Sequence, residues 1–417
     1  MNADHPYKIT MLPAGHGDCF FLEFGHEEEA FRMMIDCGPS DTWGNLKAFL
    51  DQLILDHKKI DVLLITHYDG DHIEGALKLL AEPRYSALVG QVWHNGLKEI
   101  APNLPKQADE NEETVYQEVI GDHYPAVYSG DDIVDGETEI SESQSLNLAM
   151  LLDQQNKTVN SMTKGCAITK GASIDPLGPE KDIEVFFLLP EQKALDNLLK
   201  AFRTELQKKS LSADASLCDY CQKAFDWLMN DLEEPEHDEK EIGFQNLRVD
   251  QIPELSSGSC PPTDTSPTNK ASIAIIIRYH GRKFMFPGDA HPTPLIRALK
   301  DWANACGEDL HFNIIKLPHH GAKGNCFRLL EKSSLDADVF LISTNGNRYD
   351  HPDPESLAKV VRRSSGPQPK RRLIFNYPSD AYVFFSDAGA QKRYNYSAEY
   401  RCTISDTEGD ADDRNHK

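Results

Sequence analysis

The sequence predicts an α/β sandwich, in which helices cover the outer faces of packed β-sheets, with a mainly helical segment inserted into the core. Two observations predict this fold class. Short apolar runs alternate with longer amphipathic segments in both halves of the chain, as strands alternate with helices. Three of the apolar runs also end in histidine or aspartate, so metal-binding side chains follow rigid strand ends.

The first half of the core is expected to contain strands at 7–12, 18–24, 31–36 and 60–66 and helices at 43–57 and 73–81. A Ser-, Thr- and Pro-rich segment at 258–267 reads as a flexible connection to the second half. That half is expected to contain strands at 272–279, 283–286, 313–317, 339–343, 373–377 and 381–386 and a helix at 354–363.

The segment between the two halves reads as an insertion with a strand at 183–189 and helices at 191–209 and 212–232. The predicted organisation is a core from 1–100 and 261–400, the insertion 101–260, and a disordered tail 401–417. Because the insertion interrupts the core between groups of ligand-type residues, we expect it to govern substrate choice.

The densest cluster of polar residues directly follows the apolar run 62–65. His67, Asp69, Asp71 and His72 place two imidazoles and two carboxylates within six positions. A loop at a strand end can direct the first two side chains one way and the last two another, which suggests two metal ions. The alternative is a polar turn whose side chains cap a helix that begins near Ile73.

Two later strands supply further ligands from a distance. The run 283–286 leads into Gly288 and Asp289, and the run 314–317 leads into Pro318, His319, His320 and Gly321. Three strand ends that converge on one sheet edge would fix the geometry of a metal site better than flexible loops.

The motif order HxDxDH, GDAH and PHHG resembles the metallo-β-lactamase superfamily, and within it the hydrolase domain of ComEC-type DNA-uptake proteins and their soluble relatives. Further similarity lies in AGHGDC at 14–19, IDCG at 35–38, NKASI at 269–273 and NRYDHP at 347–352. The resemblance covers roughly residues 7–95 and 265–385. It implies a four-layer αβ/βα sandwich and a metal-dependent hydrolase.

The resemblance also implies a ligand set. His67 and Asp69 would hold the first ion, Asp71, His72 and His320 the second, and Asp289 would bridge them. Asp69 stands where the superfamily commonly has histidine, and Asn269 stands where it usually has another. Oxygen ligands favour harder ions, so Mn²⁺ or Mg²⁺ are alternatives to the two Zn²⁺ ions that we favour. His94 either completes the first site or simply packs beside Trp93.

A two-ion site suits hydrolysis of a phosphodiester by a metal-bound hydroxide. Asp71 or Asp289 would orient the nucleophile, and His319 or His351 would assist the leaving oxygen, although His319 is equally suited to orienting a ligand. The residues expected to bind substrate are Asn269, Asn347 and Arg348. Asp18 and Asp36, and His94 if it is not a ligand, are expected behind the metal ligands.

The composition limits the possible partners. The chain has 43 Lys and Arg against 67 Asp and Glu, a net charge of −24, which argues against a broadly basic surface for nucleic acid. A local basic stretch at 362–372 is where DNA would bind, although a solvated loop is the plainer interpretation.

The same features suggest a cytoplasmic protein with no membrane partner. No apolar run approaches the length of a membrane span, and the N-terminus lacks the apolar stretch of a signal peptide. The nine cysteines are an odd number, which fits a reducing cytosol better than a framework of disulfides. We expect a nuclease or phosphodiesterase acting on DNA, with protein partners from a bacterial DNA-processing or anti-phage defence operon. The alternatives are a small-molecule phosphodiester or ester hydrolase and a non-catalytic interaction subunit.

Overall fold

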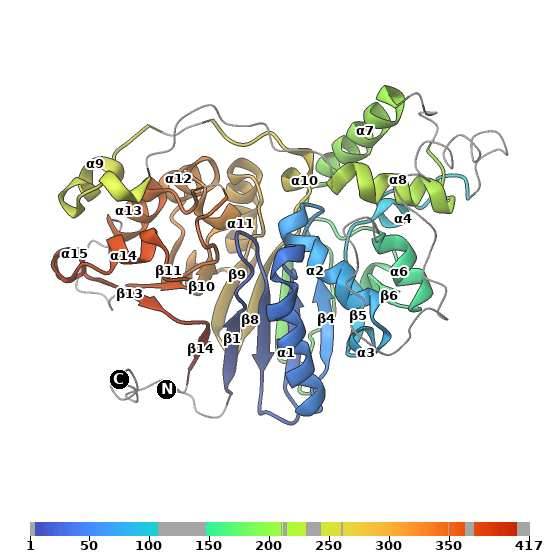
Figure 1. Ribbon diagram of the computed structural model, residues 1–417, viewed down its shortest axis with the longest axis horizontal. Coiled ribbons are helices and arrows are strands. Elements are labelled where there is room, and N and C mark those ends of the chain that lie inside the picture. The colour runs from blue at the N-terminus through green and yellow to red at the C-terminus, as the bar shows by residue number, and fades with distance from the viewer. Residues whose placement is uncertain are drawn as a thin grey trace.

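A computed structural model describes residues 5–106, 147–209, 211, 215–230, 243–259, 262–348, 350–362 and 371–406. Its two seven-stranded sheets pack face to face, with helices of the N-terminal half on one side and helices of the C-terminal half on the other (Figure 1). The predicted α/β sandwich of four layers is therefore confirmed.

The first sheet has the strand order β14-β1-β2-β3-β4-β5-β6. Its strands are β1 (Tyr7–Met11), β2 (Phe20–Phe24), β3 (Phe31–Ile35), β4 (Ile60–Leu64), β5 (Val89–Trp93), β6 (Thr158–Val159) and β14 (Thr403–Ser405). Neighbouring strands are antiparallel from β14 through β1 and β2 to β3, and parallel from β3 through β4 and β5 to β6. The parallel strands place their carboxyl ends on one edge of the sheet.

The second sheet has the order β13-β12-β11-β10-β9-β8-β7. Its strands are β7 (Ile183–Leu189), β8 (Ala274–Tyr279), β9 (Arg282–Phe286), β10 (His311–Lys316), β11 (Asp336–Ile342), β12 (Arg371–Phe375) and β13 (Tyr396–Tyr400). Strands β9 to β13 run parallel, whereas β7, β8 and β9 form an antiparallel meander.

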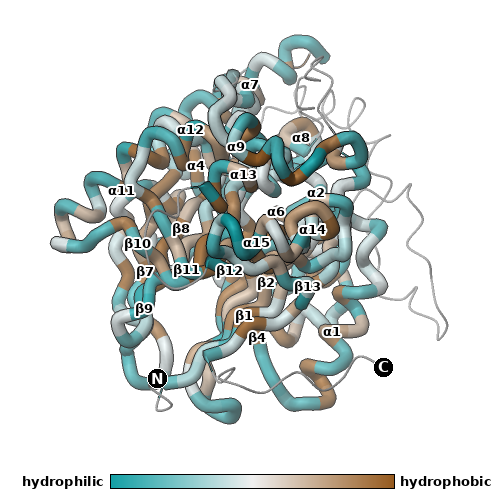
Figure 2. Tube along the Cα trace, turned by 90° about the vertical axis from the view of Figure 1, so that its left-hand side faces the viewer, coloured by the Kyte–Doolittle hydropathy of each residue, from teal (hydrophilic) through white to brown (hydrophobic). Residues whose placement is uncertain are grey.

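Alternating side chains explain how each sheet serves two cores. In β2, Phe20 and Leu22 point between the sheets, where they join residues such as Phe286 of the second sheet, whereas Phe21 points to the helices. All five residues of β2 are buried. The brown, hydrophobic positions accordingly follow the strands in Figure 2.

Amphipathic helices close the two outer cores. The first sheet is covered by α1 (Trp43–Leu55), α2 (Gly70–Ala81), α3 (Pro83–Ser86), α4 (Leu97–Ile100), α6 (Leu148–Gln154), α7 (Gln192–Lys208) and α8 (Asp219–Asn230). The second is covered by α9 (Ile252–Leu255), α11 (Pro292–Cys306), α12 (Lys323–Lys332), α13 (Pro354–Arg362), α14 (Asp380–Phe385) and α15 (Ala388–Tyr394). The short α10 (Pro267–Lys270) precedes β8. None of the helices in the described ranges is both long and apolar enough to cross a membrane.

Two sequence-based assignments near the C-terminus are wrong. The apolar run predicted as a strand at 381–386 is helix α14, because the Ser379 side chain accepts a hydrogen bond from the Tyr382 amide and caps its first turn. Strand β14 lies within the tail predicted to be disordered. Buried Ile404 pairs with Ile9 of β1 and adds a strand to the first sheet, while residues 407–417 of the tail lie outside the described residues.

The segment predicted as an insertion contributes to both sheets. Strand β6 forms one edge of the first sheet and β7 one edge of the second. The described part of the segment therefore supplies strands to the core sheets as well as helices that pack on the core. The helices α7 and α8 that it supplies pack on α4, α6 and α10, at the upper right of Figure 1. The proposed boundaries at 100 and 261 stay a prediction.

Candidate metal centre

Six predicted metal ligands meet where strands of both sheets end. Strand β4 leads into the loop and first turn of α2, β9 leads into Asp289, and β10 leads into His320. We use the term buried centre for His67, Asp69, Asp71, His72, Asp289 and His320. Each side chain of this set lies within 4 Å of a charged partner from the same set.

The Nε2 atoms of the three histidines face the carboxylates. His72 Nε2 lies 3.4 Å from Asp289 Oδ2, and His320 Nε2 lies 3.2 Å from Asp71 Oδ2 and 3.5 Å from Asp289 Oδ2. His67 Nε2 lies 3.5 Å from Asp69 Oδ2. Among the described residues, all three Nε2 atoms are buried without a hydrogen-bond partner. Buried lone pairs beside carboxylate oxygens form a donor set that suits divalent cations.

The opposite ring nitrogens are held by other groups. Nδ1 of His72 lies 2.8 Å from Asp36 Oδ2, Nδ1 of His320 lies 3.0 Å from the Ser343 carbonyl oxygen, and Nδ1 of His67 lies 2.9 Å from Thr66 Oγ1. These partners accept a proton from Nδ1, so the free lone pair is on Nε2. The Thr66 hydroxyl can accept because it donates its own proton to Asp36 at 2.7 Å.

Asp18 and Lys316 form a buried ion pair behind the same histidines. The Lys316 ammonium contacts Asp18 Oδ2 and lies 3.3 Å from Asp289 Oδ1. Asp18 Oδ1 lies 3.4 Å from Nδ1 of His320. Burial raises the pKa of Asp18, but Lys316 and His320 outweigh it and hold that pKa at about 2. Lys316 was not anticipated as a site residue from the sequence, in which it lies within the predicted strand 313–317.

The charges at the buried centre favour an added cation. Burial alone would raise the pKa of Asp71 and Asp289, yet the attraction of His72 and the other nearby positive groups lowers both. Burial would likewise lower the pKa of His72 and His320, but the surrounding carboxylates, Asp289 first, raise both. Protons and divalent ions therefore compete for the same imidazole nitrogens.

The backbone permits this close assembly at two glycines. A Cβ on Gly17 would collide with the carbonyl oxygen of Asp71, to which the Asp18 amide donates a hydrogen bond of 3.2 Å. Gly288 has φ +54°, and a Cβ there would collide with the Ser272 hydroxyl. Ser272 in turn accepts a hydrogen bond of 3.2 Å from the Asp289 amide. Glycine is needed at both places because other residues would push these loops apart.

His319 belongs to a second layer of polar groups beside the centre. Its Nε2 lies 3.9 Å from Asp289 Oδ2, and its Nδ1 lies 3.9 Å from Asp264 Oδ2. Asp264 also lies 3.0 Å from Nε2 of His291 and accepts a 3.2 Å hydrogen bond from Asn269. Asn269 is thus placed with Asp264. This role of Asp264 was not predicted, because Asp264 lies in the segment 258–267 that was expected to be flexible; its side chain is nevertheless buried.

His351 faces both this layer and a groove at the surface. Its ring centroid lies 5.7 Å from that of His319, and its Nδ1 lies 3.5 Å from Asp353 Oδ2. Burial, reinforced by His319 and His320, lowers the pKa of His351 well below its usual range. The groove has a volume of about 530 Å³. Its lining includes Gln245, Asn246, Asn345, Asn347, His351, Tyr377 and Ser379.

The expected phosphate-binding residues lie at the rim. Asn347 and Arg348 are exposed, and Nη1 of Arg348 lies 3.3 Å from Nε2 of His16. His16 adjoins Gly17, where a Cβ would collide with the Asp71 carbonyl oxygen, and this contact places the rim next to the buried centre. His16 was missed as a site residue, although it precedes Gly17 and Asp18 in a motif that was recognised.

His94 lies in a different polar cluster. Its Nε2 lies 2.8 Å from the Tyr68 hydroxyl, and its amide donates to Asn160. The Tyr68 hydroxyl also donates to Asp226 of α8 at 3.0 Å. His94 therefore makes its described contacts with groups outside the buried centre, and its role as a third ligand stays a prediction.

Comparison with known proteins gives a family match and distant structural similarities. Residues 12–144 match the family model described as the metallo-beta-lactamase superfamily. A metallo-beta-lactamase fold protein from Bacillus subtilis, YhfI, is 8% identical with a TM-score of 0.34, covering 96% of this chain and 99% of its own. CmlA, a diiron beta-hydroxylase from Streptomyces venezuelae, is 12% identical with a TM-score of 0.36, covering 96% of this chain and 54% of its own. The chain thus spans about half the length of CmlA. No curated protein matches the chain.

Proposed function

We propose that the protein is a metal-dependent hydrolase of phosphodiesters, starting from the membership of residues 12–144 in the metallo-beta-lactamase superfamily. One observation carries the proposal. Three buried imidazole Nε2 atoms, without hydrogen-bond partners in the described part of the chain, converge on carboxylates from two sheets. The residues that would hold the ions are the six of the buried centre. Zn²⁺ is favoured, with Mn²⁺ or Mg²⁺ as alternatives because Asp69 adds an oxygen donor.

Divalent ions at such a site supply Lewis acidity and lower the pKa of water. The chain contributes the orientation of the ligands. Asp36 and the Ser343 carbonyl fix the rings of His72 and His320, and Thr66 fixes His67. Lys316 offsets the charge of Asp18 and Asp289, so the anionic site can admit an anionic substrate.

The rim next to Asp71 supports a phosphate as the group recognised. The planar guanidinium of Arg348 is suited to bind two phosphate oxygens at once. Amide and hydroxyl side chains line the adjoining groove together with the carboxylates of Asp350 and Asp380, and this polar lining suits a sugar or base more than an apolar ester. Because His351 has a lowered pKa, we assign it to hydrogen bonding in this groove, and we retain His319 as the candidate to assist the leaving oxygen.

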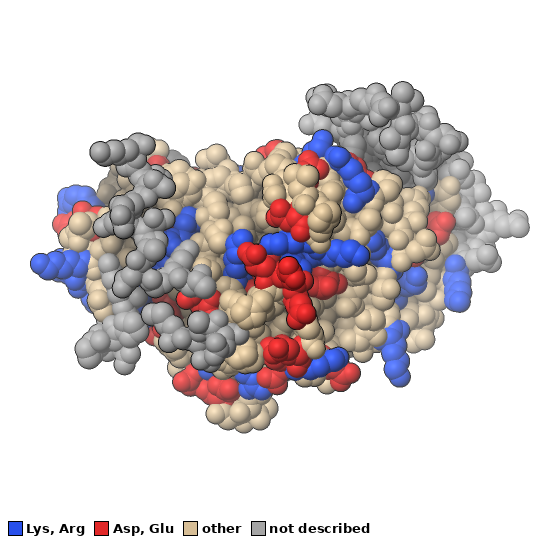
Figure 3. All heavy atoms as spheres, turned by 90° about the horizontal axis from the view of Figure 1, so that it is seen from below, with Lys and Arg blue, Asp and Glu red and all other residues tan. Residues whose placement is uncertain are grey.

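DNA is the substrate class that we favour, on the strength of the motif pattern. The described part of the basic stretch offers little support. Arg371 pairs with Asp336 at 2.6 Å and Arg372 with Glu399 at 2.9 Å, and exposed Arg362 lies over the ring of Tyr394. Acidic and basic side chains are also interspersed on the face seen in Figure 3. The net charge of −24 supports a second candidate, hydrolysis of small phosphodiesters bound in the groove.

Cleavage assays with metal-free protein reconstituted with Zn²⁺ or Mn²⁺ test the proposal. The substrates are labelled single- and double-stranded DNA and the generic diester bis(p-nitrophenyl) phosphate, and the variants are His72→Ala and the exposed-site control His311→Ala. We expect hydrolysis that His72→Ala abolishes and His311→Ala retains. Turnover of the small diester without DNA cleavage would select the second candidate. Metal-loaded protein that cleaves neither substrate would overturn the proposal and favour a non-catalytic interaction subunit.

A further inference from the structure

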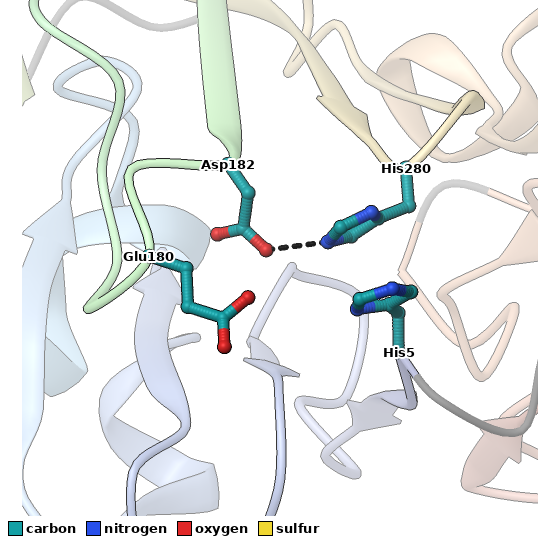
Figure 4. A group of neighbouring side chains, drawn as sticks. All are labelled: His5, Glu180, Asp182 and His280. Carbon is teal, nitrogen blue, oxygen red and sulfur yellow. Dashed lines mark hydrogen bonds and ion pairs between the residues drawn. The ribbon is translucent and has the colours of Figure 1, made fainter.

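A second group of metal-ligand side chains lies at the far end of the β8–β9 hairpin from Asp289 (Figure 4). We use the term hairpin cluster for His5, Glu180, Asp182 and His280. One ligand atom from each residue can be chosen so that all four lie within 4.8 Å of one another. The strands between the two groups have five or six residues, a separation of about 20 Å at 3.3 Å per residue.

The hairpin itself fixes His280. Residues Tyr279 and Arg282 pair across the turn, and His280 and Gly281 between them have φ values of 47° and 76°. Two central residues with positive φ form the tight turn that matches the twist of antiparallel strands. The His280 backbone is therefore held in place by the β8–β9 ladder.

Strand β7 brings the two carboxylates to the same place. Ile183 pairs with Tyr279, so Asp182 lies beside His280, and Asp182 Oδ2 lies 2.6 Å from His280 Nε2. Backbone hydrogen bonds of 2.7 and 3.2 Å between Leu177 and Ile183 close the loop that carries Glu180. Figure 4 shows the Glu180 carboxylate directed toward the side where the imidazoles lie.

The N-terminal segment supplies the second imidazole. The ring of His5 stacks on that of His280, with centroids 3.4 Å apart and an interplanar angle of 13°. The carbonyl oxygen of His5 accepts a 2.7 Å hydrogen bond from Arg282 Nη1. His5 lies two residues before the start of β1, so it links the first sheet to the hairpin of the second.

We propose that the hairpin cluster binds one divalent transition-metal ion, with Zn²⁺ as the expected occupant. Two imidazoles and two carboxylates are a donor set that Zn²⁺ accepts, and the two negative charges match its charge. The side chains of His280 and Asp182 are 25% and 18% exposed, so an ion can enter from solvent. All four positions carry protein donors, which makes the site structural: the ion would fasten residues 5–7 and the loop before β7 to the β8–β9 hairpin. This inference is independent of the proposed function.

The chain contains a matched control for a histidine–carboxylate pair without further donors. His311 Nε2 lies 2.9 Å from Asp338 Oδ1 on β10 and β11, at an exposed position. Among the described residues, the potential metal-binding groups include the hairpin cluster and residues of the buried centre with Asp18, but not this pair. His311→Ala therefore removes an exposed imidazole and its ion pair without removing a proposed ligand.

The test is Zn²⁺ binding by full-length, tag-free protein, measured by elemental analysis after dialysis and by titration against a chelating dye. The proteins are the wild type, His5→Ala/His280→Ala and His311→Ala. We expect the double variant to lose one equivalent of Zn²⁺ and His311→Ala to lose none. We also expect Zn²⁺ to raise the Tm of the wild type more than that of the double variant.

A second arm separates the two sites. In an Asp289→Asn/His320→Ala background, the hairpin cluster should still bind one equivalent, and adding His5→Ala/His280→Ala should abolish it. If the Asp289→Asn/His320→Ala protein does not fold, the Co²⁺ absorption spectrum of the wild type is compared with that of His5→Ala/His280→Ala. The difference between the two spectra should show the bands of one bound ion. Equal stoichiometry in the wild type and the double variant would overturn the proposal, as would binding at the cluster only at millimolar Zn²⁺, the mark of an adventitious ion.

Discussion

The buried centre and the hairpin cluster use the same side chains at opposite ends of the β8–β9 hairpin, but they differ in what stands behind the imidazoles. In the buried centre, His67, His72 and His320 each have Nδ1 held by a separate group. In the hairpin cluster, His280 Nε2 lies within hydrogen-bond distance of the Asp182 carboxylate, and Asp182 is itself a proposed ligand. Hydrogen-bond partners at Nδ1 fix the orientation of an imidazole that binds a reactive metal ion. A group of ligands without such partners is sufficient to bind a structural ion. The comparison suggests a catalytic role for the buried centre and a structural, stabilising role for the hairpin cluster.

The strongest way to break this comparison is Asp289→Asn. Asp289 is the carboxylate shared by His72, His320 and Lys316, so its charge is central to the buried centre alone. We expect phosphodiester turnover to fall by at least about 10³-fold, because several kcal/mol of metal-dependent stabilisation are lost. Turnover of bis(p-nitrophenyl) phosphate, with Asp309→Asn as an exposed control, measures it. Undiminished turnover would place the chemistry elsewhere.

Lys316→Met tests whether the Lys316 ammonium and a bound metal ion together neutralise the carboxylates of the buried centre. Lys316 is buried between Asp18 and Asp289, and removing one partner of a buried ion pair costs about 3–5 kcal/mol. We expect Tm to fall sharply in EDTA and to recover partly with Zn²⁺, because the ion can neutralise Asp289. Thermal unfolding with and without Zn²⁺ measures this. Equal destabilisation under both conditions would contradict the shared-charge account.

Asp36→Asn sharpens the distinction between orienting groups and ligands. Asp36 accepts from His72 Nδ1 and from the Thr66 hydroxyl, and through Thr66 it also reaches His67. We expect metal affinity at the buried centre to fall about 10–100-fold, as for other partners of metal-binding histidines, with Zn²⁺ binding at the hairpin cluster unchanged. Chelator titration distinguishes the two. An equal loss at both sites would indicate a general folding defect.

The sequence predicted those parts of the fold and site that depend on local pattern. His67 to His72, Asp289 and His320 were recognisable because each follows an apolar strand, and strand ends meet at one edge. Lys316 and Asp264 were not, because their roles come from contacts with Asp18 and with His291 and His319 across the chain. The hairpin cluster depends likewise on the pairing of β7 with β8. Local periodicity does not reveal which distant strands become neighbours, so charges that meet only in the fold escape it.

A third region shows what burial does to carboxylates without the cationic neighbours of the buried centre. Glu99 of α4 is 9% exposed, and Asp226 lies beside the Tyr68 hydroxyl. Burial raises the pKa of Glu99 to about 7 and that of Asp226 to about 6, the opposite direction from Asp71 and Asp289. Burial alone therefore cannot account for the low pKa values at the buried centre.

Glu99→Gln gives this contrast a measurable pH dependence. Burial raises the pKa of Glu99 in the folded protein from its ordinary value of 4.5 to about 7, so ionisation at higher pH lowers the stability of the wild type. We expect the variant and the wild type to be equally stable at pH 4. As pH rises from 4.5 to 7 the wild type should lose stability relative to the variant, and at pH 8 the variant should be more stable by on the order of 2 kcal/mol. Denaturant unfolding across this range, with exposed Glu28→Gln as the control, measures it. A constant difference at every pH would show that the variant changes packing alone, and the contrast with Asp71 and Asp289 would then lack a basis in ionisation.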